Sequence, residues 1–275
     1  MKGIILLGTA SDVGKSMITT AFCRLFANEG RRVTPFKSQN LSPFIEKLPS
    51  GGTISRAQYI QALAAKTTPT MDMNPIMLLP QQQMRVDVTI LGEPFGTWKG
   101  FDFREQFYNR AIETIHTSLR KLAETNDIVV IEGAGSPAEV NLNDREIVNM
   151  RVAEIADVPA ILIADISKGG AIAAIVGTLQ LLPASQRKRV KGIIINQFYG
   201  DVTRFQEGIE VIETHTNIPV LGVIPHMENH GIAEEDQLRT SAEVEATNAV
   251  FDAWAMHVKE HLAWGKVQKI VEGGA

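Results

Sequence analysis

The most constraining feature of the sequence is the stretch from Gly8 to Ser16, which lies between a short apolar run and an amphipathic segment. A strand, a glycine-bounded turn and a helix in this order are typical of a phosphate-binding loop, because successive backbone N–H groups and a helix N-terminus can surround an anion. The usual first glycine of such a loop is Thr9 here, and a glycine stands one position earlier. The final Gly-Lys-Ser predicts that Lys15 contacts phosphate and that the Ser16 hydroxyl binds Mg²⁺. The predicted nucleotide-binding residues are Thr9, Ala10, Ser11, Asp12, Val13, Gly14, Lys15, Ser16 and Met17.

Length and composition indicate one large α/β domain or two small ones, since the chain has 275 residues of which 44% are hydrophobic. The net charge is −4 and no basic stripe is visible, so nucleic acid is not an expected partner. No apolar stretch approaches the roughly 20 residues that span a bilayer, and we expect neither a membrane anchor nor a leader. The single cysteine, Cys23, excludes an intrachain disulfide and favours a cytoplasmic location.

Apolar runs and helical periodicity alternate along most of the chain. This alternation predicts an α/β fold, with a mostly parallel sheet and helices on both of its faces. We assign residues 1–236 to this domain and residues 237–275 to a helical extension packed on it. Strands are expected at 3–7, 32–36, 85–91, 127–131, 160–164, 190–195 and 219–224, helices at 15–29, 54–66, 102–124, 171–182, 205–214 and 241–264, and a loop at 41–54.

Polar residues follow two of the predicted strands, at the edge where open parallel sheets bind ligands. Lys37, Gln39 and Asn40 come after the strand at 32–36, and their number favours contact with a substrate. Glu132 follows the buried strand at 127–131, where a carboxylate can reach Mg²⁺ at a phosphate loop, directly or through water. Lys15 is expected to be solvated, and Cys23 to be a small, buried and unreactive thiol.

Taken together, these segments resemble the synthetase domain of the cobyric acid synthase family, which is related to dethiobiotin synthetase. The resemblance covers about residues 3–236 and is most specific at 132–150. Besides the phosphate loop it rests on Pro-Phe-Lys-Ser-Gln-Asn at 35–40, Arg-Ala-Gln at 56–58 with Gln61, Asp-Met-Asn-Pro at 72–75, Glu-Gly-Ala-Gly-Ser-Pro-Ala-Glu at 132–139, Asn141 with Leu142, Val-Asn-Met at 148–150 and Leu-Gly-Val-Ile-Pro at 221–225.

The resemblance implies a P-loop enzyme of the dethiobiotin synthetase-like type that uses ATP and Mg²⁺. Such an enzyme phosphorylates a peripheral carboxylate of a corrin, and ammonia then displaces phosphate from the acyl phosphate to leave an amide, a step of cobalamin biosynthesis. Lys15, Lys37 and Glu132 would be catalytic, and Ser16 and Glu132 would bind the metal. Asn196 and Pro225 match positions that bind the nucleotide, and the residues expected to face substrate are Gln39, Asn40, Gln58, Glu139 and Asn141.

Some positions depart from the family pattern. Ser55 stands where glycine is usual, Leu79 replaces a lysine, and 166–168 replaces an Asp-Arg pair. These departures leave open a related reaction on a different carboxylate, or a paralogue without the activity. Full-length relatives continue into a glutaminase domain whose cysteine releases ammonia, a role that Cys23 cannot fill. We therefore expect free ammonia or a separate glutaminase subunit as the nitrogen source.

Two other classes share the motifs. A dethiobiotin synthetase-like ligase would use a diaminated fatty acid in place of a corrin. A non-catalytic nucleotide-binding or switch protein also has this fold, but the partitioning-type switches carry an additional lysine near the start of the loop, where Ala10 stands here. Turnover with ammonia discriminates between an enzyme and a switch. We expect the chain to form a homodimer.

Overall fold

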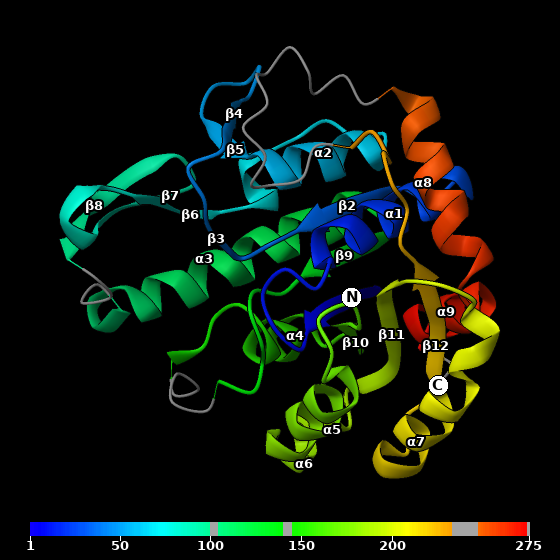
Figure 1. Ribbon diagram of the computed structural model, residues 1–275. Helices are drawn as coiled ribbons and strands as arrows, with labels where there is room; N and C mark the ends of the chain where they lie inside the picture. The colour runs from blue at the N-terminus through cyan, green and yellow to red at the C-terminus, as the bar shows by residue number, and fades with distance from the viewer. Residues whose placement is uncertain (100–103, 140–144, 233–246, 274–275) are drawn as a thin grey trace.

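The computed structural model describes residues 1–99, 104–139, 145–232 and 247–273. Their main feature is a six-stranded sheet in which every neighbouring pair is parallel (Figure 1). The predicted parallel sheet is therefore confirmed. In spatial order its strands are β12 (Val220–Pro225), β11 (Val190–Phe198), β10 (Ala160–Asp165), β1 (Gly3–Gly8), β9 (Ile128–Glu132) and β2 (Val33–Phe36).

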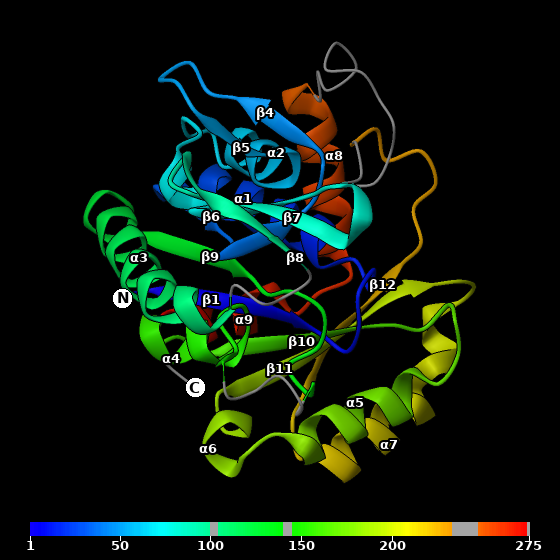
Figure 2. The same ribbon diagram turned by 90° about the vertical axis from the view of Figure 1, so that its left-hand side faces the viewer.

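Helices cover both faces of this sheet, as Figure 2 shows. Every residue of β1 is buried, and its alternate side chains enter two separate cores, Ile5 and Leu7 on one face and Ile4 and Leu6 on the other. A strand buried on both sides reads as a continuous apolar run. The first core includes residues of α3 (Arg104–Thr125), α4 (Met150–Ala156), α5 (Ala171–Leu181) and α7 (Gln206–Thr216); the second includes residues of α1 (Lys15–Asn28), α2 (Arg56–Ala64), α8 (Asn248–Glu260) and α9 (Trp264–Val271).

A second, smaller sheet extends from the carboxyl end of β2 and was not predicted. Its order is β3 (Gln39–Leu41), β6 (Ile76–Pro80), β7 (Arg85–Ile90) and β8 (Glu93–Lys99). β3 pairs with β6 in parallel, and the other pairs are antiparallel. The sheet places Gln39 and Asn40 beside the end of the main sheet. Shorter elements are α6 (Ala184–Arg187) and the 3₁₀ turns Met71–Met73, Gln82–Met84 and Val202–Phe205.

The expectation of a loop at 41–54 was wrong in part. The segment contains β4 (Ile45–Lys47) and the start of β5 (Thr53–Ser55), which pair as an antiparallel hairpin. Gly51 and Gly52 have φ values of 87° and 82°, a backbone conformation that favours glycine and that closes the turn. Two strands of three residues each carry too little periodicity to be recognised from the sequence.

The single helix expected at 241–264 is also corrected. Residues 241–246 lie outside the described part of the chain, and the rest forms α8 and α9 with a break at 261–263. At the break the Ala263 N–H donates to the Leu221 carbonyl over 2.7 Å, so the backbone pairs with the edge of β12. A Cβ atom on Gly222 would lie 2.2 Å from the His261 carbonyl oxygen, and only glycine permits this approach. None of the described helices combines the length and the apolarity needed to cross a bilayer.

Candidate active site

A pocket of about 510 Å³ lies where the adjacent strands β1, β9 and β2 end. Parallel strands bring their carboxyl ends to one edge of a sheet, and the polar residues that follow them meet there. The pocket is lined on one side by the phosphate loop and on another by β3. Its polar or charged lining residues are Ser11, Asp12, Lys15, Ser16, Thr20, Lys37, Gln39, Asn40, Glu132 and Gln197.

The phosphate loop is shaped by close contacts at two glycines. Gly14 has a φ of 92° and precedes α1 without a side chain to cap the helix, so the first N–H groups of α1 are available to an anion. A Cβ atom on Gly14 would lie 2.1 Å from Nδ2 of Asn196, which donates to the Val13 carbonyl over 3.0 Å. A Cβ atom on Gly8 would lie 2.7 Å from Nζ of Lys15. The absence of a side chain at Gly8 thus leaves room for the Lys15 ammonium group.

Lys15 is buried rather than solvated, which corrects the expectation from the sequence. Its Nζ donates to the Ala10 carbonyl over 2.9 Å and to the Gly135 carbonyl over 3.3 Å, and the residue is 7% exposed. The ammonium group therefore bridges the phosphate loop and the segment after β9. Lys15 lines the same pocket as Ser16, the next residue of α1.

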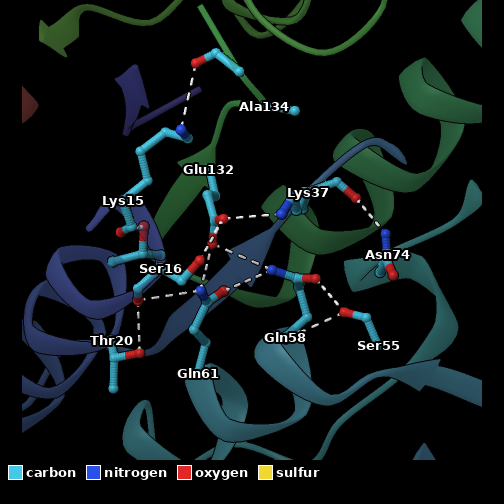
Figure 3. A network of polar contacts seen from close by, with 12 residues as sticks. Lys15, Ser16, Thr20, Lys37, Ser55, Gln58, Gln61, Asn74, Glu132 and Ala134 are labelled. Atoms are coloured by element: carbon cyan, nitrogen blue, oxygen red, sulfur yellow. Dashed lines mark hydrogen bonds and ion pairs between the residues drawn. The ribbon is translucent and has the colours of Figure 1, made fainter. Parts of the chain in front are cut away.

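Glu132, the last residue of β9, is the centre of a buried hydrogen-bond network (Figure 3). Its Oε1 accepts from the Ser16 hydroxyl at 2.8 Å and from Nζ of Lys37 at 2.9 Å. Burial raises the pKa of this carboxyl group, but the Lys37 charge and the hydrogen bonds from Gln61, Lys37 and Ser16 outweigh burial, so the pKa lies below its ordinary value. The carboxylate is charged at neutral pH although it is 1% exposed.

Two glutamines of α2 hold the second oxygen of Glu132. Gln61 donates from Nε2 to Oε2 over 2.6 Å, and Gln58 does so over 3.3 Å. Gln58 was expected to face substrate, but it is fully buried behind Glu132 and does not line the pocket. Gln61 was not predicted as a site residue. The signal in the sequence was the spacing of three between the two glutamines, which places both on one face of a helix.

Asn149, the residue before α4, belongs to the Val-Asn-Met motif at 148–150 but was not among the predicted site residues. Its side-chain amide donates to the Ala134 carbonyl over 2.7 Å and accepts from the Ala134 N–H over 3.0 Å. A Cβ atom on Gly133 would lie 2.3 Å from Oδ1 of Asn149, so this close clamp requires the glycine. The clamp fixes the segment that carries the Gly135 carbonyl to Lys15.

The remaining predicted residues fall into four groups. Ser11, Asp12, Gly14, Met17, Gln39 and Asn40 line the pocket. Thr9, Ala10 and Val13 do not line it, but their backbone groups hold the loop in place. The Thr9 N–H donates to the Ile163 carbonyl, and the carbonyl oxygens of Ala10 and Val13 accept from Lys15 and Asn196. Asn196, Pro225 and Glu139 also lie outside the lining: Asn196 is bound to the loop, the Pro225 carbonyl accepts from His257, and Glu139 is exposed. Asn141 lies outside the described residues.

The residues present fit a nucleotide with Mg²⁺. Mg²⁺ prefers oxygen ligands and is commonly held by one or two protein groups together with phosphates. The Ser16 hydroxyl donates its hydrogen to Glu132, so its oxygen lone pairs remain for a cation. Ser16 and Glu132 could therefore hold the ion, while Lys15, Lys37 and the N-terminus of α1 supply positive charge for phosphate groups.

The chain matches curated proteins named cobyric acid synthase. It is 49% identical over 235 residues to the protein of Geobacillus kaustophilus, covering 86% of this chain and 47% of the relative. It is 50% identical over 228 residues to that of Rippkaea orientalis, covering 83% and 46%. It is 46% identical over 254 residues to that of Listeria monocytogenes, covering 92% and 49%. The chain thus spans about half the length of the curated relatives it matches.

A family model and a solved structure complete the comparison. The MinD cell division protein of Aquifex aeolicus aligns with 16% identity and a TM-score of 0.45 over 95% of this chain and 98% of MinD, a likeness too weak to weigh in the assignment. The model of the CobQ/CobB/MinD/ParA nucleotide binding domain matches residues 4–240, which is most of the chain. On this match, and with the phosphate loop seated at the end of a parallel sheet, the chain belongs to the CobQ/CobB/MinD/ParA nucleotide-binding domain family.

Proposed function

We propose that this chain is an ATP- and Mg²⁺-dependent synthetase that activates a carboxylate of a corrin-like small molecule for amidation. One observation supports this proposal above the others: Lys15, Ser16, Lys37 and Glu132 line the same pocket as Gln39 and Asn40. The same pocket thus contains two cationic groups, a candidate metal site and neutral polar side chains. The names of the curated relatives supply the substrate class.

The chemistry requires activation because a carboxylate is a poor electrophile. In the proposed reaction a carboxylate oxygen attacks the terminal phosphorus of ATP, and ADP leaves. Ammonia then attacks the acyl carbon and loses a proton. The bond between the acyl carbon and the phosphate oxygen breaks, and phosphate leaves with its electron pair. Mg²⁺, when bound, would neutralise charge on the phosphate oxygens. The protein's contribution is positioning and charge neutralisation, as is general for phosphoryl transfer.

Lys37 has a central place in this proposal. Its Nζ is bound to Glu132, and the residue is 6% exposed at the wall of the pocket. In the proposed reaction it would lie between the substrate carboxylate and the transferred phosphoryl group, whose negative charges repel each other. Glu132 accepts three further hydrogen bonds, from Ser16, Gln58 and Gln61, and these would retain the carboxylate if Lys37 turned toward the phosphoryl group.

The proposed nitrogen donor is ammonia, either free or passed from a separate glutaminase. Release of ammonia from glutamine by a thioester route needs a nucleophilic cysteine activated by a base. Cys23 is fully buried in α1, and burial, with a smaller contribution from the charge of Glu132, raises the pKa of its thiol. A protonated thiol without solvent access is not a nucleophile.

The test is ATP turnover by the purified chain with corrin acids, with and without ammonium, or with diaminopelargonate and bicarbonate. ADP and an amide formed only with a corrin acid and ammonium would support the proposal. Turnover with diaminopelargonate would identify a dethiobiotin synthetase-like ligase instead. Nucleotide binding without turnover on either substrate would favour a binding or switch protein.

Glutamate release from glutamine is measured in parallel, with Cys23→Ser as control. Release that disappears in Cys23→Ser would contradict the proposed nitrogen source. The expected homodimer, the cytoplasmic location and the boundary at 236/237 stay predictions.

A further inference from the structure

We propose that Gln61 is a positioning residue for the metal site, and that Gln58 and Ser55 hold Gln61 in place. The three would determine which oxygen of Glu132 faces the ion and which is anchored to α2. This inference rests on the proposed use of Mg²⁺ with a nucleotide. It assigns a role to α2 that the pocket lining does not show, because Gln58 and Gln61 are fully buried behind Glu132.

The hydrogen bonds between the side chains of this group run in one direction, from the start of α2 to the carboxylate (Figure 3). The Ser55 hydroxyl donates to Oε1 of Gln58. Nε2 of Gln58 donates to Oε1 of Gln61 over 3.3 Å, and Nε2 of Gln61 donates to Oε2 of Glu132 over 2.6 Å. Each amide therefore has its oxygen toward Ser55 and its nitrogen toward Glu132. Rotating either amide by half a turn would place two oxygens or two nitrogens in contact, so the orientation is determined by the whole series.

The beginning of the series is fixed by the helix itself. Ser55 is the N-cap residue of α2, and its hydroxyl oxygen accepts from the Gln58 N–H over 3.4 Å while its hydrogen goes to the Gln58 side chain. One hydroxyl group thus caps the N-terminus of α2 and orients the Gln58 side-chain amide. Ser55 is 1% exposed, so water does not compete for these bonds.

The end of the series separates the two oxygens of Glu132. Oε2 accepts from the two amides of α2, whereas Oε1 accepts from Ser16 and Lys37, whose side chains line the pocket. Oε1 is therefore the oxygen on the pocket side. Nε2 of Gln61 also lies 3.4 Å from the backbone carbonyl of Ser16. Gln61 thus contacts both residues that could hold the ion, one through its carboxylate and the other through its backbone.

Loss of the Gln61 amide should loosen the metal site without removing a ligand. Without Gln61, only the longer contact of 3.3 Å from Gln58 remains at Oε2, so the carboxylate can rotate more freely and the Ser16 hydroxyl that donates to it loses its fixed partner. Removing an outer hydrogen-bond partner of a metal ligand generally weakens metal binding about 10- to 100-fold. Nucleotide binding in the absence of a divalent ion should change much less, because the loop N–H groups and Lys15 are not contacted by the Gln61 side chain.

The experiment measures divalent-ion binding apart from catalysis. Mn²⁺ replaces Mg²⁺, and free Mn²⁺ is followed by electron paramagnetic resonance while it is titrated into protein with ADP. ADP binding is measured separately in EDTA by calorimetry. For Gln61→Leu we expect Mn²⁺ binding about tenfold weaker and ADP binding in EDTA within about twofold of the original. Gln58→Leu, which removes the longer contact, should give a smaller effect in the same direction.

A matched pair of serines controls for damage to the fold. Ser55→Ala and Ser118→Ala each remove a fully buried hydroxyl group, but Ser118 lies on α3 and donates to Asp72. Both should lower the melting temperature, and only Ser55→Ala should weaken Mn²⁺ binding. If Gln61→Leu does not fold, the same comparison is made with Gln58→Leu and Ser55→Ala.

The outcomes separate this inference from the proposed function. Equal Mn²⁺ binding by folded Gln61→Leu and by the original chain would overturn the positioning role and leave the proposed function standing. Equal losses in Mn²⁺ binding and in ADP binding with EDTA would also overturn it, because that is the pattern of a general structural defect. Failure of the original chain to bind Mn²⁺ with ADP would overturn both.

Discussion

The proposed phosphate side and the proposed substrate side of the pocket are built in different ways. On the phosphate side, Lys15, Ser16 and Glu132 are held by hydrogen bonds to residues far apart in the sequence, and Glu132 alone accepts from four side chains. On the substrate side the wall is β3, a strand of three residues that ends at Leu41, which is 54% exposed. The first wall rests on the main sheet and the second on the smaller one.

We infer that a scaffold built in this way can keep its proposed phosphate chemistry while its substrate changes. Phosphoryl transfer gains from groups that are fixed before the reaction, because their reorganisation would otherwise add to the barrier. A short strand whose last residue is exposed can be altered with little effect on the main sheet. Of the departures that the resemblance to the cobyric acid synthase family implies, Leu79 lies on β6 of the smaller sheet, whereas Ser55 belongs to the hydrogen-bonded series behind Glu132. The four predictions below test this contrast, in order of expected effect.

Lys15→Ala should have the largest effect on turnover. Loss of a fixed cationic donor to the developing charge costs about 10²- to 10³-fold in rate. Because Lys15 is buried and bound to Ala10 and Gly135, we also expect a measurable fall in melting temperature, contrary to what a solvated lysine would give. Steady-state ADP release and thermal unfolding are the measurements. Unchanged turnover would remove the phosphate-loop assignment.

Glu132→Gln should have the second-largest effect, an increase in the Mg²⁺ concentration that turnover requires. The change keeps the shape of the side chain but leaves Lys37 without its partner charge in a buried place. Loss of one member of a buried ion pair is destabilising, by about 3–5 kcal/mol in general. We expect the Mg²⁺ concentration for half-maximal turnover to rise about tenfold or more, and nucleotide affinity to change less. A Mg²⁺ titration identical to the original would show that the carboxylate has no part in the ion site.

Asn40→Ala should act on the substrate side alone. Asn40 lines the pocket and is 6% exposed, on the strand that the main sheet does not include. We expect KM for the carboxylate substrate to rise about tenfold, as for a lost hydrogen bond of about 1.4 kcal/mol, with KM for ATP unchanged. An equal rise in both KM values would mean that the two walls are coupled, and would contradict the proposed separation of the two sides of the pocket.

Asp252→Asn should have the smallest effect and tests the support behind the phosphate side. Asp252 on α8 accepts from Arg24 on α1 at 2.7 and 2.8 Å, and the Arg24 side chain is buried. These hydrogen bonds, opposed by a smaller effect of burial, lower the pKa of Asp252 to about 2. Because the Asp252 side chain is 45% exposed, solvent screening keeps its contribution to about 1 kcal/mol or less.

The sign of its pH dependence follows from the lowered pKa. The stabilisation is complete above the ordinary Asp pKa of about 4 and is lost as the pH falls from 4 to 2. Urea unfolding at pH 6 and at pH 2.5 is the measurement. The difference between Asp252→Asn and the original chain should be visible at pH 6 and should shrink at pH 2.5. A difference that stays constant between these pH values would contradict an ionised Asp252 as its source.

Much of the nucleotide side could be read from the sequence alone. The glycines and Lys15 of the phosphate loop, the continuous apolar run of β1 and the polar residues at the ends of β2 and β9 are all local patterns. Periodicity and the rule for the carboxyl ends of parallel strands are enough to place Lys37 and Glu132 at one edge. Because these features depend on residues that are close together in the sequence, they can be predicted from the sequence.

The partners of each side chain depend on the packing of distant segments. Nothing near Glu132 in the sequence indicates that Gln58 and Gln61 occupy one of its oxygens, or that Lys15 reaches Gly135. The break between α8 and α9 depends on Leu221 in β12, about 40 residues earlier in the chain. Burial and hydrogen bonding at these places come from segments distant in sequence, whose approach is governed by packing of the whole sheet. For that reason the place of the proposed phosphate site could be predicted from local sequence patterns, whereas the contacts that hold its residues follow from the fold.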